Sequence, residues 1–190
     1  MTILNYNQLT GYHPAKTHFM PQETFDDIVP EEIAELDEVD IKILRLLQDN
    51  CRLTNKEIGE KLHKTSSPIN DRIHRMQEQG VIKKYAAVLN HRKINLGLIA
   101  FTHVQLKDHS EQSLTLFESE IIKNPEVLEC YHMSGEYDFI LRVATVNLPA
   151  YHHWLMTKLF RILPVGSVQS TFVMKEAKAQ APYPIKPTKK

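Results

Sequence analysis

The sequence lacks the features of a secreted or membrane-spanning protein. No segment reaches the roughly 18 consecutive apolar residues of a transmembrane helix. The first 20 residues mix Asn, Gln, His and Thr with too few apolar side chains for a signal peptide. The two cysteines, Cys51 and Cys130, lie far apart and outside any CxxC spacing, which excludes a disulfide framework and a zinc knuckle. We therefore expect a cytoplasmic protein with buried free thiols and no membrane partner.

The sequence patterns of enzymes and metal centres are also missing. The ten histidines include the adjacent pair His152 and His153, but they form no HExxH pattern and no Cys/His ligand set. No nucleophile, base and orienting third group occur together in a recognisable signature. We therefore expect no metal, no cofactor and no catalytic centre, with most histidines at the surface or at an interface.

The net charge of zero hides an uneven distribution of charge along the chain. Residues 1–35 carry one Lys against six acidic side chains, and residues 177–190 carry four Lys and no acid. Between Lys61 and Arg92, seven basic side chains accompany two acidic ones, an excess of the kind that phosphate backbones attract. This stretch therefore predicts a nucleic-acid partner.

Proline and the hydrophobic period divide the chain into five parts. Residues 1–35 contain three prolines and no sustained period, which predicts an N-terminal arm. Residues 177–190 contain three further prolines and terminal lysines, which predicts a mobile C-terminal tail. Between these ends we expect two folded domains, over 36–90 and 98–176, joined by a linker over 91–97.

Residues 36–90 are expected to form three helices and a short β ribbon. Asp37 is a candidate N-cap for the first helix, because apolar residues recur at helical spacing directly after it. Thr54 and Glu57 form the capping-box pattern that starts a second helix. A run of Thr and Ser before Pro68 starts the third helix, which a glycine ends. This order is typical of a winged helix-turn-helix.

The outer face of the third helix is the predicted DNA-contacting surface. Its apolar residues Ile69, Ile73 and Met76 point inward on a helical wheel, which leaves polar side chains on the opposite side. Such a helix lies in the major groove, where Asn suits adenine and Arg suits guanine, and the β-rich residues 81–89 would form the wing beside it. The predicted contacts are Ser66, Ser67, Asn70, Asp71, His74 and Arg75 on the helix, with Lys64, Lys83 and Lys84 on phosphates. The alternative is an ordinary solvated helix of mixed charge.

From Leu98 the hydrophobic period changes to two, which predicts strands. The expected elements are a strand from Leu98, a helix through Phe117, strands over 127–133 and 137–144, a helix from Asn147 and a strand over 166–174. This β-α-β-β-α-β order is that of a ferredoxin-like α+β sandwich, with two helices on one face of a four-stranded antiparallel sheet. The other face of that sheet needs a partner.

Three stretches, in their order and spacing, carry a resemblance to a known family. They are Leu36–Leu44 at the first helix, Arg72–Ile82 across the third helix and wing, and Ser134–Asp138 in the second domain. With them, residues 36–176 resemble the Lrp/AsnC family of leucine-responsive and asparagine-sensing regulators, also called feast/famine proteins. Each stretch alone is a weak signal, and together they are specific.

The resemblance implies a DNA-binding transcription regulator whose second domain senses a metabolite. In the family, the sheets pair face to face into homodimers that often assemble into octamers, and effectors, usually amino acids, bind between dimers. The effector-binding residues that it implies here are Gly135, Glu136, Tyr137 and Asp138. Backbone amides beside Gly135 could hold a carboxylate and Asp138 an ammonium group. The alternative is a tight hairpin in which Gly135 only makes the turn.

The chain departs from the family pattern at three places. His63 and Lys64 stand where the family usually has Gly and Leu, Pro164–Gly166 replaces its Pro-Gly-Val, and the acidic arm over 1–35 is atypical. Two other interpretations stay open: a sirohaem-decarboxylase-like enzyme on the same fold, and a sensor-only oligomer whose helix-turn-helix has decayed. The basic, polar face of the third helix disfavours the enzyme.

Overall fold

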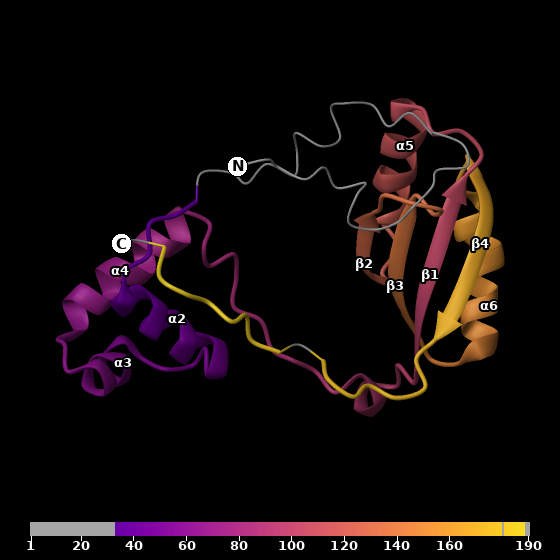
Figure 1. Ribbon diagram of the computed structural model, residues 1–190. Helices are drawn as coiled ribbons and strands as arrows, with labels where there is room; N and C mark the ends of the chain where they lie inside the picture. Colours follow the sequence, from indigo (N-terminus) through magenta and orange to yellow (C-terminus); the bar gives the residue numbers. More distant parts are fainter. Residues whose placement is uncertain (1–32, 180, 189–190) are drawn as a thin grey trace, which may run out of the picture. The chain divides into compact units, whose positions relative to one another are not determined.

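The computed structural model describes residues 33–179 and 181–188, and these residues form two units (Figure 1). The first unit contains the described residues up to Lys84 together with the segment that begins at Pro182, and the second unit is Tyr85–Ala181. The predicted N-terminal arm lies outside the described residues except for residues 33–35.

Within residues 33–84, three helices build the first unit: α2 (Glu38–Asp49), α3 (Asn55–Leu62) and α4 (Ser66–Glu78). The predicted caps of the first two helices are confirmed, since the Asp37 carboxylate accepts hydrogen bonds from two amides of α2 and Thr54 forms a capping box with Glu57. The three residues predicted to face inward from α4 are all buried with apolar residues of α2 and α3.

A buried carboxylate holds α4 against α2. The Asp40 side chain is 1% exposed, and it accepts hydrogen bonds from Arg72 at 2.8 Å and from Arg75 at 2.6 Å. Arg72 also donates to Asp37 at 2.7 Å. A buried charge without a partner destabilises a fold by about 3–5 kcal/mol. Both arginines of α4 therefore stay paired with the carboxylates of the α2 segment in the folded state. These ion pairs fix which side of α4 faces solvent.

The turn between α3 and α4 keeps its shape despite the departure at His63. His63 adopts the left-handed conformation, with φ 53° and ψ 47°, which is the role that glycine usually plays. The Lys64 amide then donates to the Gly59 carbonyl at 2.9 Å. A Cβ at Gly59 would lie 2.5 Å from the Lys64 carbonyl oxygen, so this glycine allows the close approach.

The predicted β ribbon over 81–89 is wrong. Val81 and Ile82 pack against the helical core, and the Ile82 amide donates to the Met76 carbonyl at 3.1 Å. Residues 83–90 are exposed and contain no strand, and a 3-10 helix, η2 (His91–Ile94), follows them. A ribbon needs a hairpin turn and a second strand, and the β-rich composition of this segment supplied neither.

The segment Pro182–Thr188, called here the C-terminal strap, packs on the first unit and is not the mobile tail that its composition predicted. Thr188 exchanges two hydrogen bonds with the Leu36 backbone, at 2.8 and 3.1 Å. The Ile185 side chain packs against the helical core, and its carbonyl accepts a hydrogen bond from Arg45 at 3.0 Å. The strap therefore lies along α2.

The second unit has the predicted ferredoxin-like fold. Its described elements are β1 (Leu98–Leu106), α5 (Glu111–Ile121), β2 (Val127–His132), β3 (Phe139–Thr145), α6 (Leu148–Thr157), the 3-10 helix η3 (Leu159–Arg161) and β4 (Val165–Phe172). The described strands form one antiparallel sheet in the order β2-β3-β1-β4. This order follows from two β-α-β connections that interleave, as in the ferredoxin-like sandwich.

Helices α5 and α6 cover one face of the sheet (Figure 1). Phe117 of α5 and Trp154 of α6 are buried against the alternate residues of β1 that the period of two placed on this face. Neither helix covers the opposite face, where Phe101 stands in register with Arg142 of β3 and Thr171 of β4. We call this opposite side of the sheet the open face.

Replacing His63 with glycine should stabilise the first unit. The left-handed conformation destabilises a non-glycine residue by about 1–2 kcal/mol, and the greater freedom of glycine in the unfolded chain offsets about half of that. We expect His63→Gly to raise the free energy of unfolding by about 0.5–1 kcal/mol. Urea unfolding followed by helical circular dichroism measures it, with Trp154 fluorescence reporting on the second unit. The control Lys64→Gly should lower the free energy of unfolding of the first unit. An equal decrease in both variants would contradict the strain assigned to the left-handed conformation of His63.

The ion pair of Asp37 should make the first unit sensitive to acid. Burial alone would raise the pKa of Asp37, but hydrogen bonds from the Asp40 and Val39 amides and from Arg72 lower it from 3.8 to about 2. A lowered pKa in the folded state stabilises the fold above about pH 4, and this contribution is lost as the pH falls toward about 2.

The variant Asp37→Asn keeps an N-cap but loses the charge. It should therefore be less stable than the wild-type chain near neutral pH, and the gap between them should close between about pH 4 and about pH 2. Urea unfolding of both proteins at several pH values tests this. A gap that stays constant down to about pH 2 would show that the Asp37 charge contributes nothing.

Candidate functional site

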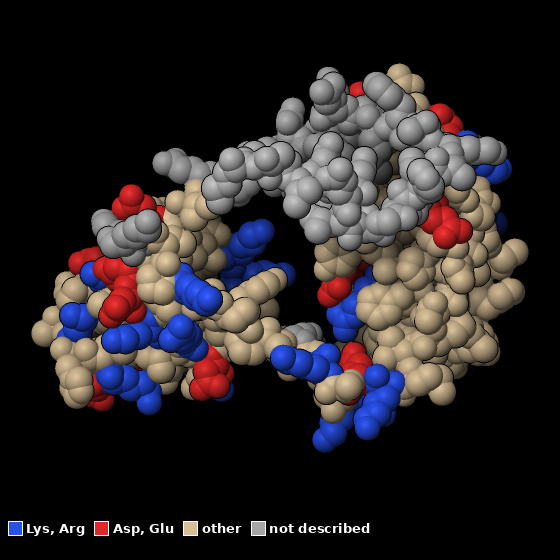
Figure 2. Space-filling view, viewed as in Figure 1, with Lys and Arg blue, Asp and Glu red and all other residues tan. Residues whose placement is uncertain are grey.

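The outer face of α4 is exposed and polar, as its helical period predicted. Exposed positions include all six residues predicted there and the three lysines around them: Ser66, Ser67, Asn70, Asp71, His74, Arg75, Lys64, Lys83 and Lys84. In Figure 2, basic side chains of the first unit alternate with acidic ones on the face in view. The outer face of α4 itself carries both Asp71 and Arg75, so it is mixed in charge and recognition through it depends on individual side chains.

Three of these side chains already have partners within the first unit. Arg75 donates to Asp40, although its side chain remains 44% exposed. His74 lies 3.2 Å from Glu78 one turn further along α4. The Asn70 Oδ1 atom accepts a hydrogen bond at 2.9 Å from the Nδ2 atom of Asn55, the first residue of α3. Part of the donor and acceptor capacity of this face is therefore used internally.

The N-terminus of α4 is open to an anion. Thr65 stands at the N-cap position but makes no side-chain hydrogen bond there, and the first turn carries no acidic residue. In the first turn the backbone amides of Ser66 and Ser67 therefore keep their donors at the positive end of the helix dipole, whereas Pro68 has no N–H. Such a helix end binds a phosphate group well.

The segment Ser134–Asp138 forms the turn between β2 and β3, called here the effector turn. Gly135 has φ 134°, a conformation that side-chain-bearing residues rarely adopt. No atom outside its chain neighbours lies within 4 Å of where a Cβ would stand. The glycine therefore makes the turn, and the space beside it is open.

Asp138 fastens the effector turn to the end of β1. Its Oδ2 accepts a hydrogen bond from the Leu106 amide at 2.7 Å, and its Oδ1 lies 2.9 Å from the His109 Nδ1. The neighbouring Tyr137 hydroxyl donates to Gln169 of β4 at 2.6 Å. The residues predicted as the effector site thus lie on one turn, and two of them hold it in place.

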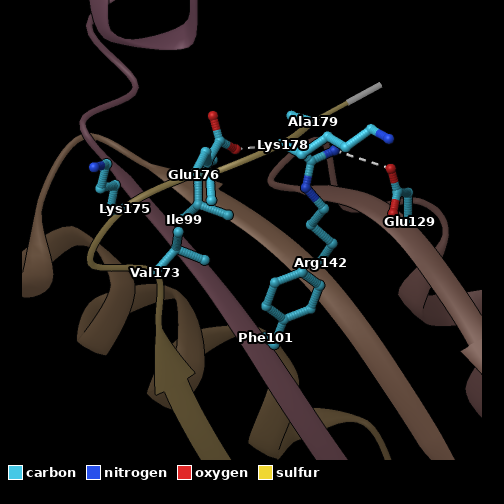
Figure 3. A pocket seen from close by; sticks show the side chains of 10 residues that line it. Ile99, Phe101, Glu129, Arg142, Val173, Lys175, Glu176, Lys178 and Ala179 are labelled. Carbon is cyan, nitrogen blue, oxygen red and sulfur yellow. Dashed lines mark hydrogen bonds and ion pairs between the residues drawn. The ribbon is translucent and has the colours of Figure 1, made fainter. Parts of the chain in front are cut away.

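The open face carries a hollow of about 640 Å³ beside Phe101 and Arg142 (Figure 3). Arg142 donates to Glu129 at 2.9 Å and lies 3.8 Å from Glu176. Its guanidinium is therefore already neutralised by two carboxylates. The hollow contains apolar and charged groups side by side, as a surface for another protein does more often than a small-molecule site.

The cysteines differ from each other in burial. Cys51 is exposed, so the expectation of a buried thiol is wrong there. Burial, followed by the charge of Glu118, raises the pKa of Cys130 to about 11. Among the residues that the structure describes, no group of three His, Cys, Asp or Glu side chains could hold a metal ion. The same part of the chain contains no helix long and apolar enough to cross a membrane.

Three residues that shape the outer face of α4 were not predicted from the sequence. Asp40 and Arg72 orient the helix, and Asn55 contacts Asn70 from the neighbouring helix. Asp40 and Arg72 each stood inside a stretch that carried the family resemblance, and a charged residue on the inward side of a helical wheel was the available signal. Asn55 gave no signal, because its contact with α4 depends on the angle between two helices.

Two families match consecutive parts of the chain. Residues 36–83 match the winged helix-turn-helix DNA-binding family, and residues 99–183 match the Lrp/AsnC ligand binding domain. The chain is 32% identical over 153 residues to the Bkd operon transcriptional regulator of Pseudomonas aeruginosa, covering 80% of this chain and 100% of that protein. It is 35% identical to the leucine-responsive regulatory protein of Rhizobium meliloti, covering 76% of this chain and 92% of that protein.

A solved structure agrees with these relatives. The crystal structure of a transcriptional regulator from Neisseria meningitidis in complex with L-Met matches with a TM-score of 0.74 and 36% identity, over 78% of this chain and 96% of that chain. All three proteins are named as regulators, so the enzyme interpretation has no support and the prediction of a regulator is confirmed. The chain belongs to the Lrp/AsnC family of transcriptional regulators.

Proposed function

We propose that this chain regulates transcription by placing α4 in the major groove of duplex DNA. The observation that carries the proposal is the exposed polar face of α4, with its open N-terminus, held in one orientation by the ion pairs to Asp40. The first-turn amides beside Ser66 and Ser67 would bind a phosphate, and Asn70 and His74 would reach base edges. The side-chain caps of α2 and α3 and the turn before α4 are formed, which supports a working helix-turn-helix over a decayed one.

The lysines have a separate role in this proposal. Lys64, Lys83 and Lys84 are exposed at the turn before α4 and just after it. They would contact phosphates on either side of the groove, which fixes the register without selecting sequence. Arg75 keeps free N–H donors beyond its pair with Asp40, so it would contact guanine or a phosphate from a fixed position.

The functional unit in this proposal is a homodimer that forms through the open face, with an octamer as the further assembly. An open sheet face that carries Phe101 beside Arg142 would be covered when two copies pair symmetrically. Pairing would also display α4 twice, which suits a two-fold symmetric operator. Since its partner is DNA, the protein would act in the cytoplasm of a bacterial or archaeal cell.

The effector would be an amino acid that binds at the effector turn. The Neisseria meningitidis relative is named as a complex with L-Met, which supports this class of ligand. Gly135 leaves open space beside the turn, and its neighbouring amides would hold the carboxylate. Glu136 is exposed, and Asp138 would present an already hydrogen-bonded carboxylate to the ammonium group.

Replacing Lys83 and Lys84 with alanine should weaken binding to every duplex alike. Each lost phosphate contact should lower the slope of log K against log salt by about 0.9. Fluorescence anisotropy with a duplex pool, at several salt concentrations, measures both effects. The control Lys107→Ala with Lys123→Ala removes the same charge from the second unit and should leave the slope unchanged. Equal slopes in all three proteins would contradict the phosphate contacts.

Replacing Gly135 with a bulky residue such as Trp should abolish the response to the effector or the assembly beyond the dimer. The φ of 134° strains any side-chain-bearing residue, and the side chain would fill the open space beside the turn. Thermal shifts with a panel of amino acids, read together with oligomer mass, measure the response. DNA affinity without effector should stay measurable.

Gly80→Trp is the matched control for this change. Gly80 also has a positive φ, 70°, and open space around it, but it lies in the first unit. It carries the same kind of backbone strain without touching the effector turn. If Gly135→Trp retains both the amino-acid response and the oligomer mass of the wild-type chain, the effector turn has been assigned wrongly.

A further inference from the structure

Asn55 and Asn70 form a side-chain pair that joins the start of α3 to the outer face of α4. The Asn55 Nδ2 atom donates to the Asn70 Oδ1 atom at 2.9 Å. Asn55 is half-buried, whereas Asn70 is exposed in the middle of the predicted DNA-contacting face. One amide is thus held between two helices and the other faces solvent.

The surroundings of Asn55 determine which way its amide points. It directly follows the N-cap Thr54, whose capping box with Glu57 fixes the backbone at this helix end. The positive end of α3 favours the amide oxygen of Asn55 near the free helix amides, and this leaves the Nδ2 group for Asn70. Asn55 therefore acts on Asn70 as a hydrogen-bond donor.

A donor at Asn55 determines which atoms Asn70 offers to DNA. Since its Oδ1 faces Asn55, the outward group of Asn70 is the Nδ2 group, with two N–H donors. In the major groove, guanine presents two acceptors and thymine one, adenine presents one acceptor beside a donor, and cytosine presents only a donor. The usual pairing of Asn with adenine uses the amide oxygen and nitrogen together, and here the oxygen is turned toward Asn55.

We propose that Asn55 is a positioning residue for DNA recognition, which orients the Asn70 amide so that α4 prefers guanine or thymine over cytosine at one base in each half-site. This inference rests on the proposed function and adds to it a base preference and the residue that sets it. Asn55 itself contacts no base in this mechanism, because its amide is used against Asn70.

The test is a variant that reverses the orientation of the Asn70 side-chain amide. An aspartate at position 55 can only accept hydrogen bonds, so in Asn55→Asp the Nδ2 group of Asn70 turns inward and its oxygen turns toward the groove. The preferred bases at that position should then change to adenine or cytosine, which present donors. The fold should be retained, because an acidic residue in the first turn of α3 suits the helix dipole. Circular dichroism melting checks this point.

The preference is read from a duplex pool with a randomised central stretch, selected by binding to the full-length protein and sequenced. The base ratio at the responding position should change by at least about fivefold between wild type and Asn55→Asp. Asn70→Ala should flatten the preference at the same position, and Asn55→Ala should broaden it. Anisotropy with single duplexes that differ at this base then confirms the reversal.

Lys56→Gln is the matched control. It changes the charge by the same amount as Asn55→Asp at the next residue of α3, which is exposed. It should weaken binding to all duplexes without changing the preferred base. The comparison therefore separates an effect of charge alone from an effect of the orientation of the Asn70 amide. An Asn55→Asp protein that binds DNA and selects the same base as wild type at every position would overturn this inference and leave the proposed function standing. A wild-type chain that enriches no sequence would overturn the proposed function as well.

Discussion

The ion pairs of the buried Asp40 carboxylate determine how the first unit presents α4 to its surroundings. Two arginines on the same helix neutralise this charge, and the loss of either would remove part of the pairing of a buried carboxylate. Rotation of α4 about its own axis is therefore strongly opposed. The exposed face of the helix becomes a rigid template, and rigidity of this kind lowers the entropy lost when two surfaces bind.

Local signals in the sequence were sufficient for most of the helices. The cap at Asp37, the Thr54–Glu57 capping box and the inward positions of α4 all depend on residues within four positions of each other. The strands of the second unit were equally visible, because a sheet covered on one face by helices imposes a period of two. The ferredoxin-like order then followed from the sequence of elements.

The features that were missed depend on contacts distant in sequence. Residues 81–89 contain Val, Ile and Tyr, which favour strands, but strand formation requires a partner, and composition does not supply one. Arg75 looked free on a helical wheel, whereas a carboxylate 35 residues earlier binds it. Prolines and lysines made the C-terminal segment look mobile, and only the coordinates show Ile185 packed on the first unit. Side-chain partners across helices are set by tertiary geometry.

The C-terminal strap has a consequence for how the protein is made. The two hydrogen bonds between Leu36 and Thr188 close the first unit across almost the whole described chain. During translation, the helices α2 to α4 emerge early, but their last neighbours arrive only after the entire second unit has been synthesised. The first unit therefore acquires its final packing only once translation is complete.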